Sequence, residues 1–291
     1  MKLADGFVAL VAGGTRGAGR GIAVELGAAG ATVYVTGRSS RGSPSSMGRP
    51  ETIEETAELV TAEGGRGIPL RVDHTVPAQV RALVDRLGAE QDGRLDLLVN
   101  DIWGGDALTR WGVTFWEHPL EEGLHMQRLG VHTHLITSWF AAPLMVARAT
   151  GLIVEITDGA SPGYRGNLFY DLAKAGVIRL ALAEGADLRP HGVTVVGLTP
   201  GFLRSEAMLD HFGVTAQTWQ DGIARDLHFA ASETPRFVGR AVVALAADPE
   251  VAARSGQTLT SWDLAEEFGF TDVDGARPHW GRYFAQHVEG S

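Results

Sequence analysis

The sequence predicts a single α/β domain in which about seven parallel strands form a sheet with helices on both faces. Apolar strand patterns alternate with helical patterns along most of the chain, as is typical of a doubly wound parallel sheet. A glycine-rich stretch also separates the first strand pattern from the first helical pattern. With 291 residues, 44% of them hydrophobic and 21% charged, the chain can bury a core of this size.

The expected elements follow one another in a regular order. Seven apolar runs are expected to form the strands, near residues 7–12, 31–36, 67–72, 95–99, 151–157, 193–198 and 256–260. The helical patterns lie near residues 18–29, 51–63, 77–90, 119–148, 168–189 and 235–247. Right-handed crossovers place the carboxyl ends of such strands at one edge, where ligands bind.

Two stretches lack a regular pattern. Residues 200–234 are irregular, and we expect them to form a lid over the ligand-binding edge. The tail, residues 262–291, fits neither a strand nor a helix pattern. No interdomain linker or internal repeat is recognisable, so residues 1–291 are expected to form one domain.

Charge and composition exclude several classes of function. The net charge of −10 argues against a nucleic-acid partner, because such proteins need a positive surface. The absence of cysteine excludes disulfides, thiol catalysis and thiolate metal sites. No basic-then-apolar leader begins the chain, and no apolar run reaches the roughly eighteen residues of a membrane span. We therefore expect a cytoplasmic protein without a membrane partner.

The glycine-rich stretch predicts a binding site for a dinucleotide. Gly13, Gly17 and Gly19 lie between the strand near 7–12 and the helix near 18–29. Glycine allows a sharp turn and the close approach of a phosphate, and the start of a helix favours an anion. Thr15 and Arg16 belong to the same turn. The alternative is a turn that only packs the helix tightly against the strand.

The end of the second strand predicts a preference for NADP(H). A fold that prefers NAD usually has an acid there for the ribose hydroxyls, but here Arg38 follows the strand and the next acid is Glu51. The Arg38 guanidinium could bind a 2′-phosphate, and Arg16 could reach the same group. The alternative is that Arg38 and Arg41 are ordinary cations of a loop.

Polar residues end the third and fourth strands. Asp73 could accept a hydrogen bond from the adenine amino group, or it could cap the helix that begins near Pro77. Asn100 lies at a buried strand end, where a polar side chain commonly binds backbone groups.

Tyr170 and Lys174 form the most specific chemical pattern. Residues four apart share one face of a helix. A free tyrosine has a pKa of about 10, and a nearby ammonium lowers it by favouring the phenolate. The pair follows the strand near 151–157 by one loop and can therefore face the strand ends. This arrangement indicates a proton donor and acceptor.

With these features in order, residues 5–262 resemble the short-chain dehydrogenase/reductase family, which has a Rossmann-type fold. Residues 12–19 match its glycine turn, with Ala12 in place of threonine, and Pro200-Gly201 with Ser205 resembles its nicotinamide-side motif. Of the family sequence Asn-Asn-Ala-Gly, only Asn100 is kept. Residues 100–103, Gly130 and residues 255–265 look most like the dehydrogenase/reductase member 1 branch.

The resemblance implies roles for individual residues. Tyr170 would be the general acid/base, Lys174 would bind the nicotinamide ribose, and residues 199–201 would border the nicotinamide. The residues expected to bind the cofactor are Gly13, Thr15, Arg16, Gly17, Gly19, Arg38, Asp73, Asn100, Tyr170, Lys174, Pro200 and Gly201. Members of this family are usually dimers or tetramers, so a homodimer or homotetramer is expected.

Two family residues are missing. Strand alignment puts Asp158 where the family has its catalytic serine, whereas the usual spacing from Tyr170 indicates Thr157, and Ser161 is a third candidate. A carboxylate cannot donate a hydrogen bond to a carbonyl, and its charge raises the pKa of a neighbouring tyrosine. The catalytic asparagine aligns with Gly130.

Other clusters are less specific. His118, His125 and His132 are spaced by seven residues on an expected helix, so about 10.5 Å of rise separates neighbours, which is too far for a shared ion. No metal site is therefore expected. Trp103, Trp111, Phe115 and Trp116 follow the fourth strand and could line a substrate pocket or form a subunit contact.

The sequence leaves two functional hypotheses. The first is an NADP(H)-dependent oxidoreductase that transfers a hydride between the nicotinamide and a small carbonyl or secondary alcohol substrate. The second is a dinucleotide-binding protein with weak or no catalysis, acting as a sensor or partner subunit. The second rests on the replacement of the family serine and asparagine by Asp158 and Gly130.

Overall fold

The computed structural model describes residues 1–45, 47–160 and 163–288. Its centre is a seven-stranded sheet in the order β3-β2-β1-β4-β5-β6-β7, in which each neighbouring pair is parallel. The strands are β1 (Val8–Ala12), β2 (Thr32–Gly37), β3 (Arg66–Arg71), β4 (Leu97–Asn100), β5 (Gly151–Ile156), β6 (Val193–Thr199) and β7 (Thr258–Thr260). The doubly wound sheet expected from the sequence is confirmed.

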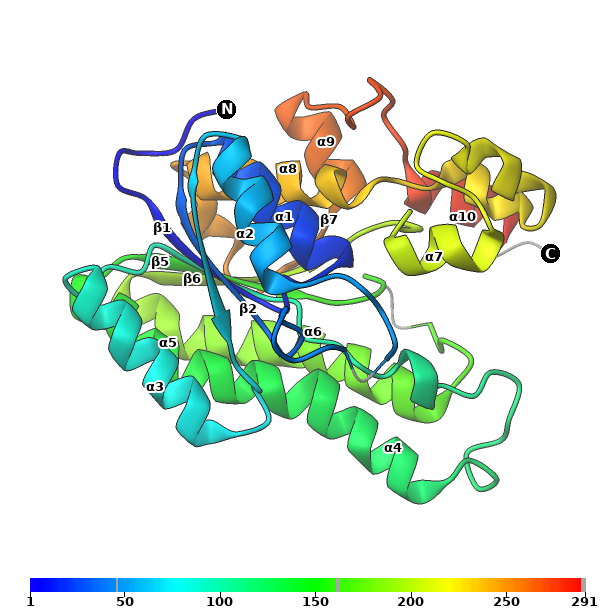
Figure 1. Ribbon diagram of the computed structural model, residues 1–291, viewed down its shortest axis with the longest axis horizontal. Helices are drawn as coiled ribbons and strands as arrows, with labels where there is room; N and C mark the ends of the chain where they lie inside the picture. The colour runs from blue at the N-terminus through cyan, green and yellow to red at the C-terminus, as the bar shows by residue number, and fades with distance from the viewer. Residues whose placement is uncertain (46, 161–162, 289–291) are drawn as a thin grey trace.

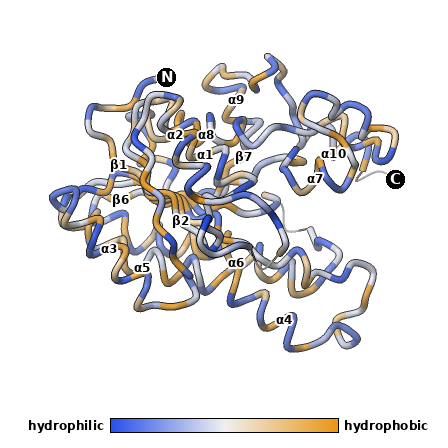
Figure 2. The backbone as a smooth tube through the Cα atoms, viewed as in Figure 1, coloured by the Kyte–Doolittle hydropathy of each residue, from blue (hydrophilic) through white to orange (hydrophobic). Residues whose placement is uncertain are grey.

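Helices cover both faces of this sheet (Figure 1). One face carries α1 (Gly17–Ala28), α2 (Ile53–Ala62), α8 (Pro235–Ala247) and α9 (Ser261–Phe268). The other carries α3 (Pro77–Glu90), α5 (Thr133–Arg148) and α6 (Leu168–Leu188). Because side chains alternate along a strand, Ala9 and Val11 enter one core while Val8 and Leu10 enter the other. Figure 2 shows the strands as the most hydrophobic part of the chain.

The helix expected near residues 119–148 is interrupted. It consists of α4 (Leu120–Gln127), a π-helical turn η2 (Arg128–His132) and α5. Gly130 lies in this π turn, and such turns occur frequently at functional sites. His118 precedes α4 rather than sharing its face, so the expected stripe of three histidines on one helix was wrong.

The expected lid and tail contain short helices that the sequence pattern did not reveal. Within residues 200–234 lie α7 (Glu206–Phe212) and the 3₁₀ helices η4 (Trp219–Ala224) and η5 (Leu227–Ala231). The tail, which matched neither a strand nor a helix pattern, contains α9 and α10 (Trp280–His287). Such helices contain too few turns for a clear period. The remaining 3₁₀ helices are η1 (Asp106–Leu108), η3 (Arg189–His191) and η6 (Val251–Arg254).

The tail returns to the segment of residues 200–234. Trp280 of α10 packs edge-on against Phe202, with ring centroids 5.7 Å apart, and Tyr283 of α10 packs edge-on against His228 of η5, with ring centroids 5.8 Å apart. None of the helices in the described part of the chain combines the length and the apolar character needed to cross a bilayer.

The strand register defines the ligand-binding edge. Ala12 of β1 is level with Thr36 of β2 on one side and with Asn100 of β4 on the other. The chain winds outward in opposite directions from β1 and β4, and ligands bind in the crevice at such a reversal point.

Candidate active site

The glycine turn brings the end of β1 against the loop after β4. Gly13 has a φ of +90°, which L side chains rarely adopt. A Cβ at Gly13 would lie 2.2 Å from the backbone oxygen of Asp101. This position therefore accepts only glycine, and the close contact holds residues 101 and 102 over the start of α1.

Carboxylates already occupy two donors in the first turn of α1. The N–H of Gly17 donates to Glu206 Oε2 (2.8 Å), and the N–H of Gly19 donates to Asp101 Oδ2 (2.5 Å). Within the described chain, the N–H of Ala18 has no acceptor. The positive end of a helix favours anions, so one free donor between two carboxylates is available for a phosphate oxygen.

Asp101 is an ionisable group that sequence reasoning missed. Burial raises the pKa of its carboxyl to about 7, against the opposing effects of the Lys174 ammonium and the Gly19 N–H. Its charge therefore changes near neutral pH, directly beside the glycine turn. The signal in the sequence was an acid in the second position of the family's Asn-Asn pair.

Thr15 and Arg16 lie where the turn meets the end of β2. Thr15 is buried beside Gly37. The Arg16 Nε lies 3.2 Å from Glu51 Oε2, and its Nη2 lies 3.4 Å from the Ser39 hydroxyl. Glu51 also binds Arg49 through both of its oxygens. The first acid after β2 is thus neutralised by two arginines.

Arg38 and Arg41 differ in their surroundings. The exposed Arg38 side chain extends from the end of β2 toward Gly104 after β4. It has no ion-pair partner in the part of the chain that the structure describes. Arg41, in contrast, forms a 2.8 Å ion pair with Glu58. Of the two, Arg38 is thus the one without an ion-pair partner among the described residues, and its guanidinium lies near the loop after β4.

Asp73 forms a local turn. Its Oδ1 accepts hydrogen bonds from the Thr75 N–H (2.9 Å) and hydroxyl (2.6 Å). The N-cap of α3 is Val76, with no side-chain cap, so Asp73 is not the direct cap that the sequence allowed. The reason is that the turn through residues 73–76 intervenes.

Asn100 belongs to a buried polar network and binds other side chains, not the backbone groups expected at a buried strand end. Its Nδ2 donates to Glu155 Oε1 (2.7 Å) and lies 3.0 Å from the Ser138 hydroxyl. The other oxygen of Glu155 lies 2.6 Å from His134 Nδ1, and His134 Nε2 lies 3.1 Å from the backbone oxygen of Ile102. This network fixes the loop after β4. Sequence reasoning missed it, although Glu155 inside an apolar strand was a visible signal.

Tyr170 is positioned by the cap of α6. Asn167 accepts a hydrogen bond from the Tyr170 N–H (3.0 Å) and donates to the backbone oxygen of Arg110 (2.9 Å). Tyr170 therefore lies in the first turn of α6, and its hydroxyl donates to Asp158 Oδ2 at 2.7 Å. Lys174 follows one turn later, with Nζ 5.5 Å from the centre of the Tyr170 ring.

The electrostatics of this pair differ from the expectation that Lys174 lowers the pKa of Tyr170. Burial, reinforced by Asp158, raises the pKa of Tyr170 above its ordinary value. Burial also lowers the pKa of Lys174, although Asp158 and Asp101 oppose this effect. The phenol therefore stays protonated near neutral pH while it is bound to Asp158.

The candidates for the missing serine have different positions. Thr157 is buried, and its hydroxyl donates to the backbone oxygen of Lys174 at 2.8 Å. Asp158 is the residue in contact with the Tyr170 oxygen. Ser161 lies outside the described residues.

The motif at residues 199–201 lies at the carboxyl end of β6. The Thr199 hydroxyl accepts a hydrogen bond from the Gly159 N–H (2.9 Å). Pro200 follows at the end of β6, and the Gly201 N–H donates to the buried Glu233 (2.9 Å). Ser205 caps α7. These bonds connect the loop after β5, the end of β6 and the segment of residues 200–234.

Two of the four aromatic residues after β4 enclose Tyr170. The rings of Trp103 and Trp111 lie 5.5 Å and 5.2 Å from the Tyr170 ring. Phe115 and Trp116 are 55% and 70% exposed, and they contact each other. Two of these tryptophans therefore border the Tyr170 ring, and the other two aromatic side chains lie at the surface.

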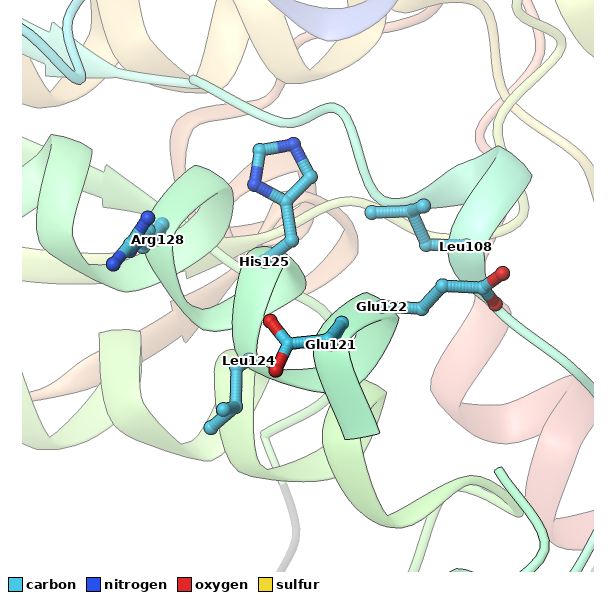
Figure 3. A pocket seen from close by; sticks show the side chains of 6 residues that line it. All are labelled: Leu108, Glu121, Glu122, Leu124, His125 and Arg128. Carbon is cyan, nitrogen blue, oxygen red and sulfur yellow. The ribbon is translucent and has the colours of Figure 1, made fainter. Parts of the chain in front are cut away.

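A separate pocket of about 380 Å³ opens beside α4 (Figure 3). It is lined by Leu108, Glu121, Glu122, Leu124, His125 and Arg128. It does not include Tyr170, Lys174 or the glycine turn. Among the described residues, no group of three or more histidine or acidic side chains could hold a metal ion.

Comparisons with known proteins agree with this geometry. Residues 7–212 match the family model for short chain dehydrogenases. The human dehydrogenase/reductase SDR family member 1 is 37% identical over 275 residues, covering 93% of this chain and 84% of that protein. A 3-oxoacyl-[acyl-carrier-protein] reductase of Synechocystis is 28% identical, with coverages of 87% and 94%. A solved short chain dehydrogenase of Mycobacterium thermoresistibile has a TM-score of 0.77 and 25% identity, with coverages of 94% and 91%.

Proposed function

Because this chain belongs to the short-chain dehydrogenase/reductase family, we propose that it is an NADP(H)-dependent oxidoreductase acting on a small carbonyl or secondary alcohol. One observation carries the proposal. The Tyr170 phenol and the Lys174 ammonium lie side by side near the loop that also contacts the phosphate-binding turn.

The residues present fit a phosphorylated dinucleotide. Gly13 removes the side chain that would fill the turn, and the free Ala18 N–H points to a diphosphate site at the start of α1. Arg38 supports NADP(H), because its guanidinium lacks an ion-pair partner among the described residues and can bind a 2′-phosphate through two donors. Arg16, already paired with Glu51, has a secondary role in this proposal.

The nicotinamide, when bound, supplies or accepts the hydride at its C4 atom. Tyr170 exchanges the matching proton with the substrate oxygen. In alcohol oxidation, the substrate hydroxyl gives its proton to the Tyr170 oxygen while the Tyr170 hydroxyl gives its own to Asp158. In carbonyl reduction, both transfers run in reverse. Tyr170 thus relays a proton without having to ionise, which fits its raised pKa.

Lys174 and Thr157 have supporting roles in this mechanism. No carboxylate or carbonyl of the described chain forms a hydrogen bond or ion pair with Lys174 Nζ, so its donors are available to the ribose hydroxyls. The Thr157 hydroxyl binds the Lys174 backbone and thereby fixes α6 against β5. Asp158 replaces the family serine as the residue beside the phenol.

A second candidate function also has a specific observation in its favour. Burial and the hydrogen bond to Asp158 both raise the pKa of Tyr170 and so make it a weaker acid. A dinucleotide-binding sensor or partner subunit with little catalysis would tolerate this environment.

The test is turnover of NADPH or NADP⁺ by the purified chain with a panel of ketones, aldehydes and secondary alcohols. We expect substrate-dependent turnover that falls by about 10²- to 10⁴-fold in Tyr170→Phe, the range for a general acid/base. Cofactor binding without turnover across the panel would support the second candidate. A Tyr170→Phe variant as fast as the parent would contradict the proton role.

A further inference from the structure

Trp103 is held rigidly beside the candidate catalytic pair. Its indole Nε1 donates a 2.7 Å hydrogen bond to Asp106 Oδ1, which fixes the plane of the ring. Its edge packs against the Tyr170 ring, with an interplanar angle of 90°. The side chain is therefore an ordered part of the site.

The ammonium of Lys174 lies over this ring. The distance from Lys174 Nζ to the centre of the Trp103 ring is 4.0 Å, shorter than the 5.5 Å to the Tyr170 ring. Tryptophan offers the most favourable aromatic face for a cation. Within the described residues, this is the nearest contact recorded for the ammonium group, which has no ion-pair or hydrogen-bond partner there.

The space for the indole exists because residue 130 is glycine. A Cβ at Gly130 would lie 2.7 Å from Trp103 Cζ3 and 3.5 Å from the Ala173 Cβ. An asparagine, which the family resemblance leads one to expect there, would displace the ring. Gly130 lies in the π turn η2, so the turn and the missing side chain together make room for Trp103.

We propose that Trp103 is a positioning residue for Lys174, and that its indole occupies the space of the family asparagine and holds the ammonium beside Tyr170. The catalytic part of this inference rests on the proposed function. Without the aromatic face, the ammonium is free to turn toward Asp158 or Asp101, the carboxylates that act on its charge. An ion pair there would remove its donors from the ribose site.

The sequence allows a direct test, because the chain contains two lysines, Lys2 and Lys174. Protein labelled with ¹³C at the lysine Cε should show two ε-methylene signals by NMR, and Lys174→Arg assigns them. We expect the Lys174 signal to be shifted upfield by the ring current of Trp103. The shift should vanish in Trp103→Leu and persist in part in Trp103→Phe, while the Lys2 signal stays unchanged.

This measurement does not depend on catalysis. An unshifted Lys174 signal in the parent, or a shift unchanged in Trp103→Leu, would overturn the inference. If Trp103→Leu does not fold, Gly130→Ala provides the second variant, because its added methyl group should displace the indole and reduce the shift. A folded Gly130→Ala protein with the parental shift would contradict the packing argument.

Kinetics test the positioning role separately. With a substrate from the carbonyl panel, Trp103→Leu should lower kcat at least tenfold with little change in the substrate KM, whereas Trp103→Phe should stay within a few-fold of the parent. Trp116→Leu, an exposed tryptophan of the same loop, is the matched control and should leave kcat unchanged. A parental kcat in Trp103→Leu would overturn the role. A parent that turns over nothing would refute the proposed function and leave the NMR test of the contact valid.

Discussion

The Tyr170 hydroxyl donates a 2.7 Å hydrogen bond to the Asp158 carboxylate, in the position where the family resemblance leads one to expect a serine. A serine can donate a hydrogen bond to the substrate, whereas this carboxylate accepts one from the phenol. The bond changes the chemistry of the site, because it connects the proton of Tyr170 to a group that can take it.

The first prediction concerns this proton. In Asp158→Asn the amide cannot accept a proton, so we expect alcohol oxidation at neutral pH to fall by about 10²-fold, the lower range for acid/base catalysis. Initial rates with NADP⁺ and a secondary alcohol measure the effect. Asp187→Asn, which changes an exposed acid near the C-terminal end of α6, is the control. Unchanged oxidation in Asp158→Asn would refute the relay.

The second prediction concerns the choice of cofactor. Arg38→Ala should weaken NADPH binding by about 10-fold or more, the loss of a charge-assisted bond of about 1.5–3 kcal/mol, and should leave NADH binding nearly unchanged. Calorimetric titration measures both affinities. Arg41→Ala removes a cation that is already paired with Glu58 and should change neither. Equal binding of NADH and NADPH by the parent would contradict the phosphate argument.

The third prediction concerns pH. Since the pKa of Asp101 is about 7, the group is charged above that pH and neutral below it. A nearby diphosphate raises this pKa further, so cofactor binding takes up a proton in the window above pH 7. Affinity should therefore rise as the pH falls from about 9 to 7 and level off below. Asp101→Asn should flatten this dependence, as judged by the ratio of parental to variant Kd at each pH.

The fourth prediction concerns Glu206 of α7. Glu206 of α7 binds the Gly17 N–H and also lies 3.4 Å from Arg20, so it places a negative charge at the start of α1. Glu206→Gln keeps an acceptor there but removes the charge, and we expect NADPH to bind about five-fold tighter, about 1 kcal/mol for charges at contact in water. Asp210→Asn, which affects an exposed acid of α7, is the control. Weaker binding in Glu206→Gln would show that the charge supports the bound state instead.

The fifth prediction concerns stability. Burial raises the pKa of Glu233 to about 8, despite hydrogen bonds from Ser261 and the Gly201 N–H. The folded state thus binds more protons than the unfolded state between about pH 4 and 8, and stability falls as the pH rises through that window. Glu233→Gln should reduce this fall by up to about 4 kcal/mol. Urea unfolding at pH 5, 7 and 9 measures it, and parallel pH profiles of parent and variant would contradict the effect.

The sequence by itself determined the order of strands and helices, because hydrophobic periodicity is a local property that survives in the folded chain. It also determined the glycine turn at Gly13 and the shared helix face of Tyr170 and Lys174, since both depend on short spacings. The eight-residue helices α9 and α10 were not predicted from the sequence. Their patterns are too short to distinguish from a loop.

Only the tertiary structure decided which groups meet. The choice between Asp158 and Thr157 beside the Tyr170 hydroxyl depends on how β5 and α6 pack. The contact of Lys174 with Trp103 joins residues 71 positions apart in the sequence. The direction of the pKa shift of Tyr170 was reversed from the expectation because burial and the neighbouring Asp158 carboxylate both raise it. Burial belongs to the assembled fold, and no spacing of residues along the chain expresses it.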